Sequence, residues 1–169
     1  MTPADAVRAG LSRYATFTGR GARGEFWWFL AFVMLGALIL SYVDAALFGG
    51  NTEEIDASPR QPLTGLWLLA LLIPTLAVGW RRMHDSGRAG IAILLPLLFS
   101  FAFLFFALIG MAGIVTLGGG EGVFRMLGSG FLFAAVASQG VLTVLMLIWL
   151  TKPSDSGPNA YGPPPGDPA

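Results

Sequence analysis

The stretch that divides this chain is WRRMHDSGRAG, residues 80–90. It contains three of the ten lysine and arginine residues and the single histidine. The runs beside it, residues 63–80 and 91–117, contain no charged residue. Because a helix needs about 20 apolar residues to cross a bilayer, these runs predict two membrane-spanning helices joined by a short polar hairpin.

The composition extends this interpretation to the whole chain. Of its 169 residues, 54% are hydrophobic and 12% are charged, which is more apolar material than a soluble core of this size buries. Two further uncharged runs, residues 26–43 and 126–150, also have the length of a span. We therefore predict an all-α integral membrane protein, a bundle of four transmembrane helices within residues 26–150. The spans lie near residues 26–48, 63–80, 91–113 and 129–150, and Gly118–Gly120 marks the last turn.

The basic residues predict the orientation of the spans. Arg60 and Arg125 lie on one side, and the other eight lie on the opposite side: Arg8, Arg13, Arg20, Arg23, Arg81, Arg82, Arg88 and Lys152. Loops rich in arginine and lysine stay in the cytoplasm. We therefore expect the N- and C-termini and the hairpin at residues 80–90 to be cytoplasmic, with the acidic connector at residues 49–62 outside.

The two terminal segments differ in their predicted order. In residues 1–25, Thr2 suits a helix N-cap and Asp5 suits the first turn. The apolar positions that follow at helical spacing are Val7, Leu11, Tyr14 and Phe17. This pattern predicts an amphipathic helix on the membrane surface, with a frayed segment as the alternative. Residues 151–169 are rich in proline and glycine, which favours a disordered cytoplasmic tail.

The polar hairpin is the first candidate for a functional site. If the helix before it continues past residue 80, Arg81, His84 and Asp85 share one face. Asp85 is then within reach of Arg81 or Arg88. Gly87 favours the end of that helix, because glycine adopts the left-handed backbone conformation of a C-terminal cap.

Three kinds of function are open for the residues on this side of the membrane. Arginine binds phosphate oxygens, so a basic face would recognise anionic lipid headgroups, although topology alone would also account for the arginines. His84 and Asp85 would serve a membrane-embedded enzyme, but adjacent residues rarely point in the same direction. A channel or transporter would place ionisable groups at mid-membrane, where these spans have none. Glu25, at the start of the first span, is able to pair with Arg81 or Arg82.

The composition argues against several other classes of function. The formal net charge is zero, so nothing attracts the chain as a whole to nucleic acid. The chain has no cysteine and one histidine, and its acidic residues lack the spacing of calcium ligands. We therefore expect no metal site, no cofactor and no catalytic residue.

Three motifs follow one another along the chain. They are F-x-G-R-x-x-R-x-E-F-W at residues 17–27, RRMHDSGR at residues 81–88 and G-x-N-x-Y-G-P at residues 157–163. In order and spacing they resemble the small bacterial inner-membrane proteins grouped as domain of unknown function 805. The resemblance implies a multi-pass protein of the bacterial plasma membrane and brings no activity with it. All three motifs fall on the predicted cytoplasmic side, so we expect them to form one surface, with Asn159 and Tyr161 as turn or docking residues.

The sequence thus predicts a non-enzymatic membrane module that binds anionic lipid headgroups, a protein partner or a second copy of the chain. Its candidate residues are Arg20, Arg23, Glu25, Arg81, Arg82, His84, Asp85, Gly87, Arg88, Asn159 and Tyr161. A small channel or transporter is the alternative, and an enzyme that uses His84 and Asp85 is the third hypothesis.

Overall fold

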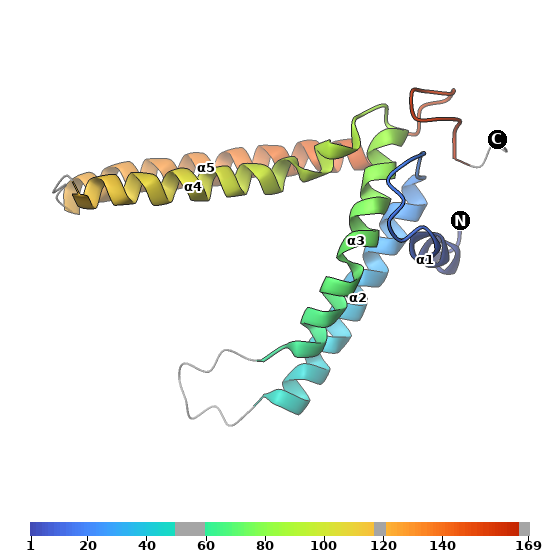
Figure 1. Ribbon diagram of the computed structural model, residues 1–169, viewed down its shortest axis with the longest axis horizontal. Coiled ribbons are helices and arrows are strands. Elements are labelled where there is room, and N and C mark those ends of the chain that lie inside the picture. The colour runs from blue at the N-terminus through green and yellow to red at the C-terminus, as the bar shows by residue number, and fades with distance from the viewer. Residues whose placement is uncertain (50–59, 117–120, 166–169) are drawn as a thin grey trace. The chain divides into compact units, whose positions relative to one another are not determined.

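The structure is a computed structural model that describes residues 1–49, 60–116 and 121–165, with the backbone alone for residues 114, 115 and 121–127. Its elements are α1 (Pro3–Ser12), α2 (Arg23–Phe48), α3 (Pro62–Asp85), the 3-10 helix η1 (Gly90–Leu94), α4 (Leu95–Thr116) and α5 (Glu121–Thr151) (Figure 1). Four helices have the length and composition of a membrane span, which confirms the predicted all-α membrane protein. The predicted turn at residues 118–120 and most of the acidic connector lie outside the described residues.

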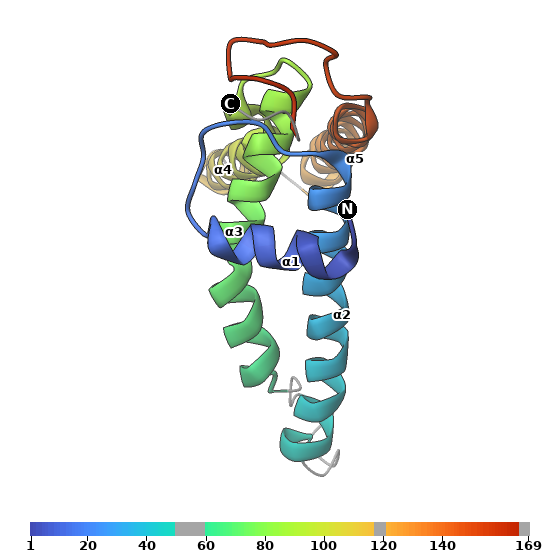
Figure 2. The ribbon, with the colours of Figure 1, turned by 90° about the vertical axis from the view of Figure 1, so that its right-hand side faces the viewer.

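The chain divides into two units, residues 1–90 with 153–169 and residues 91–152. The first contains α1, the antiparallel hairpin of α2 and α3, and the C-terminal tail. Figure 2 shows α1 lying across α2 and α3. The second contains the hairpin of α4 and α5. Assembly of all four spans into one bundle stays a prediction.

Close packing holds α2 against α3. The indole of Trp67 donates a hydrogen bond from Nε1 to the carbonyl oxygen of Val33 at 2.9 Å. A Cβ atom on Gly36 would lie 2.4 Å from the Trp67 ring, so only glycine permits this approach. The faces turned away from this packing stay exposed, as Leu35 (59%) and Leu69 (67%) illustrate. Exposed apolar helix faces of this size require lipid as their solvent.

Helix α1 begins where the sequence predicts. Thr2 is its N-cap, the Thr2 hydroxyl accepts from the Asp5 N–H at 3.2 Å, and the Asp5 carboxylate accepts from the Thr2 N–H at 3.1 Å. The hydrogen bond from the Thr2 side chain lowers the pKa of Asp5 below its usual value. The helix packs through Ala6 and Gly10, and the predicted apolar stripe is only part of this packing, since Leu11 stays 41% exposed. Gly10 allows the close approach because a Cβ atom there would lie 2.4 Å from the ring of Phe29.

A proline in α3 provides the acceptor that holds the segment just after α1 against α3. Pro74 has no N–H group, so the carbonyl oxygen of Ala70, four residues earlier, loses its helical donor. The hydroxyl of Tyr14, just beyond α1, donates to that oxygen. An unpaired backbone carbonyl is costly in an apolar environment, so this hydrogen bond ties the N-terminal segment to a defined level of α3.

Helix α3 continues to Asp85, five residues beyond the predicted end of its span. Gly87 then adopts a φ of +71°. The N–H of Gly87 donates to the His84 carbonyl at 3.1 Å, and the N–H of Arg88 donates to the Met83 carbonyl at 3.0 Å. This pair of bonds is a Schellman C-cap, which confirms the predicted helix end at Gly87.

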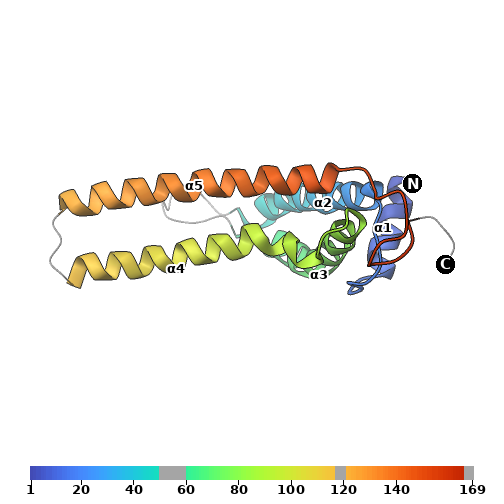
Figure 3. The ribbon, with the colours of Figure 1, turned by 90° about the horizontal axis from the view of Figure 1, so that it is seen from above.

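The second unit is a plain helical hairpin in which α4 and α5 run side by side (Figure 3). Phe103 meets Phe131 with ring centroids 5.0 Å apart, and Ser100 donates to the Gln139 side-chain oxygen at 3.2 Å. Most of the other large apolar side chains are exposed, Phe133 by 77%. The described residues of this hairpin therefore pack only sparsely against each other and offer most of their apolar surface to lipid.

Candidate functional site

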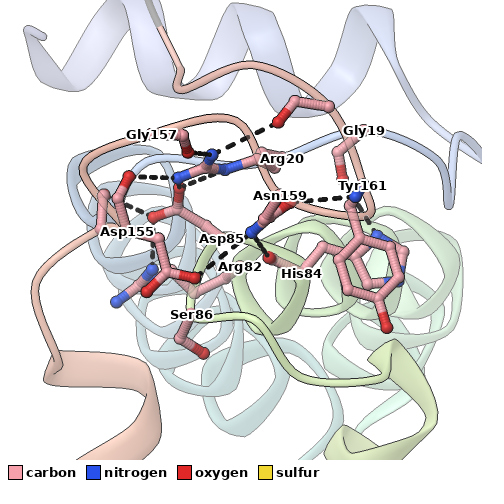
Figure 4. Close-up of polar contacts among 12 residues, drawn as sticks. Gly19, Arg20, Arg82, His84, Asp85, Ser86, Asp155, Gly157, Asn159 and Tyr161 are labelled. Carbon is pink, nitrogen blue, oxygen red and sulfur yellow. Dashed lines mark hydrogen bonds and ion pairs between the residues drawn. The ribbon is translucent and has the colours of Figure 1, made fainter.

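The polar residues of the three sequence motifs meet at the C-terminal end of α3 (Figure 4). We call this group the polar cluster, and its members are Arg20, Arg82, His84, Asp85, Ser154, Asp155, Asn159 and Tyr161. They come from three separate parts of the chain: the segment before α2, the last turn of α3, and the tail after α5. All three parts belong to the first unit.

Asp85 is the centre of the polar cluster. Its carboxylate accepts hydrogen bonds from Arg20 Nε at 3.0 Å and from Arg82 Nη1 at 2.6 Å, and a third from the hydroxyl of Ser154. The residue has no exposed surface, and both guanidinium groups are buried as well. A buried carboxylate is tolerated only when charges and hydrogen bonds satisfy it, and here the protein supplies all of them.

Arg20 connects Asp85 to the tail. Its Nη1 donates to the carbonyl oxygen of Gly157 at 2.7 Å and to that of Gly162 at 3.3 Å, while Nη2 donates to the carbonyl of Asp155 at 2.7 Å. The planar guanidinium has five N–H donors in a fixed arrangement, which lets one side chain bind a carboxylate and a curved stretch of backbone together. Arg20 therefore fixes the path of residues 155–162.

Tail residues also satisfy the end of α3. The last carbonyl groups of a helix have no partner within it. The N–H of Asp155 donates to the carbonyl of Asp85 at 3.1 Å, and the side-chain amide of Asn159 donates to the carbonyl of His84 at 3.0 Å. The tail itself is closed by two hydrogen bonds between Asn159 and Gly162. Whereas the composition predicts a disordered tail, the structure gives residues 153–162 a defined path held by these partners.

His84 has its ring fixed on two sides. Its Nδ1 lies 3.0 Å from the carbonyl oxygen of Gly19 and must donate to it, since a carbonyl oxygen only accepts. The ring of Tyr161 stacks on the imidazole with a centroid distance of 3.8 Å and an interplanar angle of 5°. His84 is only 7% exposed. The side chain is thus held as part of the packing between α3, the segment before α2 and the tail.

A second buried ion pair lies beside the polar cluster. Glu25, in the first turn of α2, accepts from Arg81 Nη2 at 2.8 Å and from Arg13 Nη2 at 3.1 Å. Arg81 also donates from Nη1 to the carbonyl of Thr16 at 2.5 Å. The predicted pair of Glu25 with Arg81 is confirmed. The predicted partners of Asp85 are wrong, since it pairs with Arg82 and Arg20 rather than with Arg81 or Arg88.

The structure brings most of the predicted site residues together, but they lie in the interior of the protein and not on its surface. Arg81 and Arg82 have no exposed surface and Arg20 keeps 6%, so these three do not form the predicted basic surface. Their guanidinium groups point into the protein because buried carboxylates and backbone carbonyl oxygens accept hydrogen bonds from them. Arg23 begins α2 with an exposed side chain, and Arg88 is half-buried and donates to the Ser86 carbonyl at 3.3 Å.

Sequence reasoning missed three members of these networks. Ser154 and Asp155 stand just before the third motif, and Arg13 stands just before the first. A signal was available for Asp155 alone, because a buried arginine needs several acceptors and the Asp155 carbonyl accepts from Arg20. Ser154 and Arg13 are donors, to Asp85 and Glu25, and no local sequence pattern marks them. Within the described parts of the chain, no three histidine, cysteine, aspartate or glutamate residues gather as metal ligands would.

The three motifs that form the polar cluster also relate the chain to known proteins. Residues 14–163 match the family model described as "Protein of unknown function (DUF805)". The chain belongs to the DUF805 family. The match covers α2 to α5 and the ordered tail, so the cluster lies within the part that defines this DUF805 protein.

Two relatives in Escherichia coli K12 extend this result. The inner membrane protein YhaI is 35% identical over 82 residues, which cover 47% of this chain and 60% of YhaI. The uncharacterized protein YiiR is 35% identical over 75 residues, 44% of each chain. The match thus spans about half the length of these relatives. No solved structure matches the DUF805 chain. With four helices able to span a bilayer, this chain is a multi-pass protein of the bacterial inner membrane.

Proposed function

We propose that this chain is a non-enzymatic module of the inner membrane whose activity is binding, and that the polar cluster is its structural lock. By lock we mean the set of hydrogen bonds and ion pairs that fastens residues 19–20 and 153–162 to the last turn of α3. The observation that carries the proposal is Asp85, a fully buried carboxylate that accepts from Arg20, Arg82 and Ser154. In this role the ion pairs specify which segments meet, as buried polar groups do in other folds.

The environment of His84 supports a binding module over an enzyme. A general base needs an open site beside it where a substrate proton would lie. Here Nδ1 donates to Gly19, Tyr161 covers one face of the ring and the residue is only 7% exposed, so little open space lies beside the imidazole for a substrate. Asp85, the other residue of the enzyme hypothesis, has each oxygen occupied by a donor from the chain.

The predicted recognition of lipid headgroups or a partner needs a different set of residues. Arg20, Arg81 and Arg82 are buried and form ion pairs with Asp85 or Glu25, and only Nε of Arg81 is without an acceptor among the described residues. An external phosphate would therefore first have to displace Asp85 or Glu25. We therefore assign binding to the surface that the lock arranges and not to its ion pairs. The arginine distribution supports a cytoplasmic position for this surface.

The proposal is tested by releasing one arm of the lock. In the full-length protein in detergent, Arg20→Gln removes the ion pair with Asp85 and the donors to the tail. We expect chymotrypsin to cleave after Tyr161 at least about tenfold faster, because losing one partner of a buried pair raises the population of the open state. Arg60→Gln is the control, since Arg60 is an exposed arginine at the other end of α3.

Two outcomes of that experiment are informative. Ser154→Ala removes one hydrogen bond to Asp85, whereas Arg20→Gln removes an ion pair and several donors to the tail. A smaller increase in cleavage for Ser154→Ala, with α-helical content kept, would support the lock. If the tail of the wild-type protein is cleaved as fast as that of Arg20→Gln, the lock does not exist.

A further inference from the structure

A groove with a volume of about 530 Å³ runs between the N-terminal half of α1 and one face of α2. This volume lies within the range of about 300–1,000 Å³ that is typical of ligand sites. The side chains that matter for its chemistry are Pro3, Val7, Arg8, Trp28, Ala31 and Leu35. All but Arg8 present mainly apolar surface, so the groove suits a hydrocarbon chain with one positive group at its border.

Arg8 is the unusual member of this lining. Among the residues that the structure describes, Arg8 takes part in no ion pair, whereas four other arginines pair with Glu25 or Asp85. Its acidic neighbour on α1, Asp5, already accepts from the N–H and the hydroxyl of Thr2. An exposed guanidinium above an apolar groove is complementary to an anionic group that carries a long apolar tail.

The membrane supplies such a molecule at this place. α2 is a membrane-spanning helix, and only 11% of its most apolar stretch is buried within the protein. Trp28 at the rim is 47% exposed, and tryptophan prefers the level of the lipid headgroups, where its ring is apolar and its N–H is wet. The wall of the groove therefore continues from headgroup level at Trp28 into the apolar layer at Leu35.

We propose that the groove between α1 and α2 binds one phospholipid, with an acyl chain along Ala31 and Leu35 and the anionic headgroup on Arg8. This inference rests on the proposed binding activity and names its ligand class. It uses none of the residues of the polar cluster. Loss of the lock and loss of the lipid site are therefore separate results.

The test uses full-length protein reconstituted in nanodiscs of equal parts phosphatidylglycerol and phosphatidylcholine, then extracted into detergent. Mass spectrometry measures the two lipids that stay bound. We expect the wild type to retain phosphatidylglycerol over phosphatidylcholine, and Arg8→Gln to lower that ratio about fivefold, the factor expected for one arginine near an anionic headgroup. Ala31→Trp fills the groove and is expected to remove the retained lipid of either kind.

Matched controls separate this site from the general lipid layer. Arg60→Gln removes an exposed arginine elsewhere, and Leu69→Trp enlarges a lipid-facing residue on α3 that is 67% exposed. Both are expected to retain lipid as the wild type does. The proposal is overturned if Arg8→Gln leaves the ratio unchanged, if Arg60→Gln lowers it equally, or if Ala31→Trp retains the same lipid. Chymotrypsin cleavage after Tyr161, unchanged in Arg8→Gln and Ala31→Trp, shows that the lock is intact in both.

Discussion

The helices of the α2–α3 hairpin and of the α4–α5 hairpin are all long and apolar enough to span a membrane, yet the two hairpins differ in their interiors. One third of the most apolar stretch of α3 is buried within the protein, and none of that of α4 is. The first hairpin has glycine positions that admit aromatic rings, a helix packed across it and a buried carboxylate near each end. Between the described residues of α4 and α5 lie the ring contact of Phe103 with Phe131 and the hydrogen bond of Ser100 with Gln139. Hydropathy therefore specifies that a segment enters the membrane, whereas a few polar and glycine residues specify which helices pack closely.

Two of the three buried carboxylates of the first hairpin, Asp44 and Asp85, show how this works. Asp44, late in α2, accepts from the backbone N–H groups of Leu63 at 3.1 Å and Thr64 at 2.8 Å. It thereby caps the N-terminus of α3 from the neighbouring helix, where positive N–H groups lack helical partners. Asp85 at the other end of α3 gathers arginines and the tail. Each end of the α2–α3 hairpin is thus fixed by a buried carboxylate, although hydropathy alone would treat a carboxylate in these helices as unfavourable.

The largest expected effect comes from Asp85→Asn. The asparagine removes the carboxylate charge that pairs with both Arg20 and Arg82, and losing one partner of a buried ion pair costs about 3–5 kcal/mol of unfolding free energy. We expect the midpoint of thermal unfolding in detergent to fall by on the order of 10 °C. Asp5→Asn, at an exposed carboxylate of α1, is the control and should shift the midpoint far less. Equal shifts in the two variants would show that Asp85 is not a special position.

A smaller effect distinguishes glycine in the two hairpins. Gly36→Ala places a Cβ atom 2.4 Å from the Trp67 ring and should destabilise the protein by about 1–3 kcal/mol. Gly110→Ala in α4 meets no atom within 4 Å and should be neutral or stabilise by up to about 1 kcal/mol. Thermal unfolding of both variants measures the difference. If Gly110→Ala destabilises the protein more than Gly36→Ala does, the claim that only the first hairpin is closely packed is wrong.

The hydrogen bond between Tyr14 and α3 should be worth about 1 kcal/mol, the usual net value of one such bond. Tyr14→Phe removes the donor to the Ala70 carbonyl. The same change in a Pro74→Ala background should cost nearly nothing, because an alanine at position 74 has an N–H group that reaches that carbonyl. A double-mutant cycle from unfolding midpoints measures the coupling, and two additive changes would mean that the proline does not create the Tyr14 site.

The smallest effect is expected in the second hairpin. Gln139→Leu removes the acceptor that Ser100 has on α5 and leaves the Pro96 carbonyl, at 2.8 Å, as its acceptor within α4. Side-chain hydrogen bonds between membrane helices are worth about 0.6 kcal/mol on average. We expect a shift of the unfolding midpoint of no more than a few degrees. Thr143→Val is the comparison, since Thr143 bonds to its own helix at the Gln139 carbonyl. A destabilisation as large as that of Asp85→Asn would make the second hairpin as dependent on polar interactions as the first.

Much of the fold and part of the site follow from the sequence in physical terms. Apolar runs of span length, the Thr2 cap and the glycine at the end of α3 were predictable because each depends on neighbours in sequence. The pair of Glu25 with Arg81 was predictable from their shared side of the membrane. The partners of Asp85 and the order of the tail were not, because they depend on residues far apart in the chain, such as Arg20 with Asp85. The composition of the tail favours disorder and carries no sign that Arg20 and His84 bind it.

Hydrogen–deuterium exchange of the tail tests the lock most directly. In the wild-type protein, the N–H groups of Asp155, Asn159, Tyr161 and Gly162 are all hydrogen-bonded within the first unit. We predict that a peptide covering residues 153–165 exchanges more slowly in the protein than in isolation, and that Asp85→Asn removes this protection while the centre of α3 keeps its own. A wild-type tail that exchanges as fast as the isolated peptide would contradict the lock.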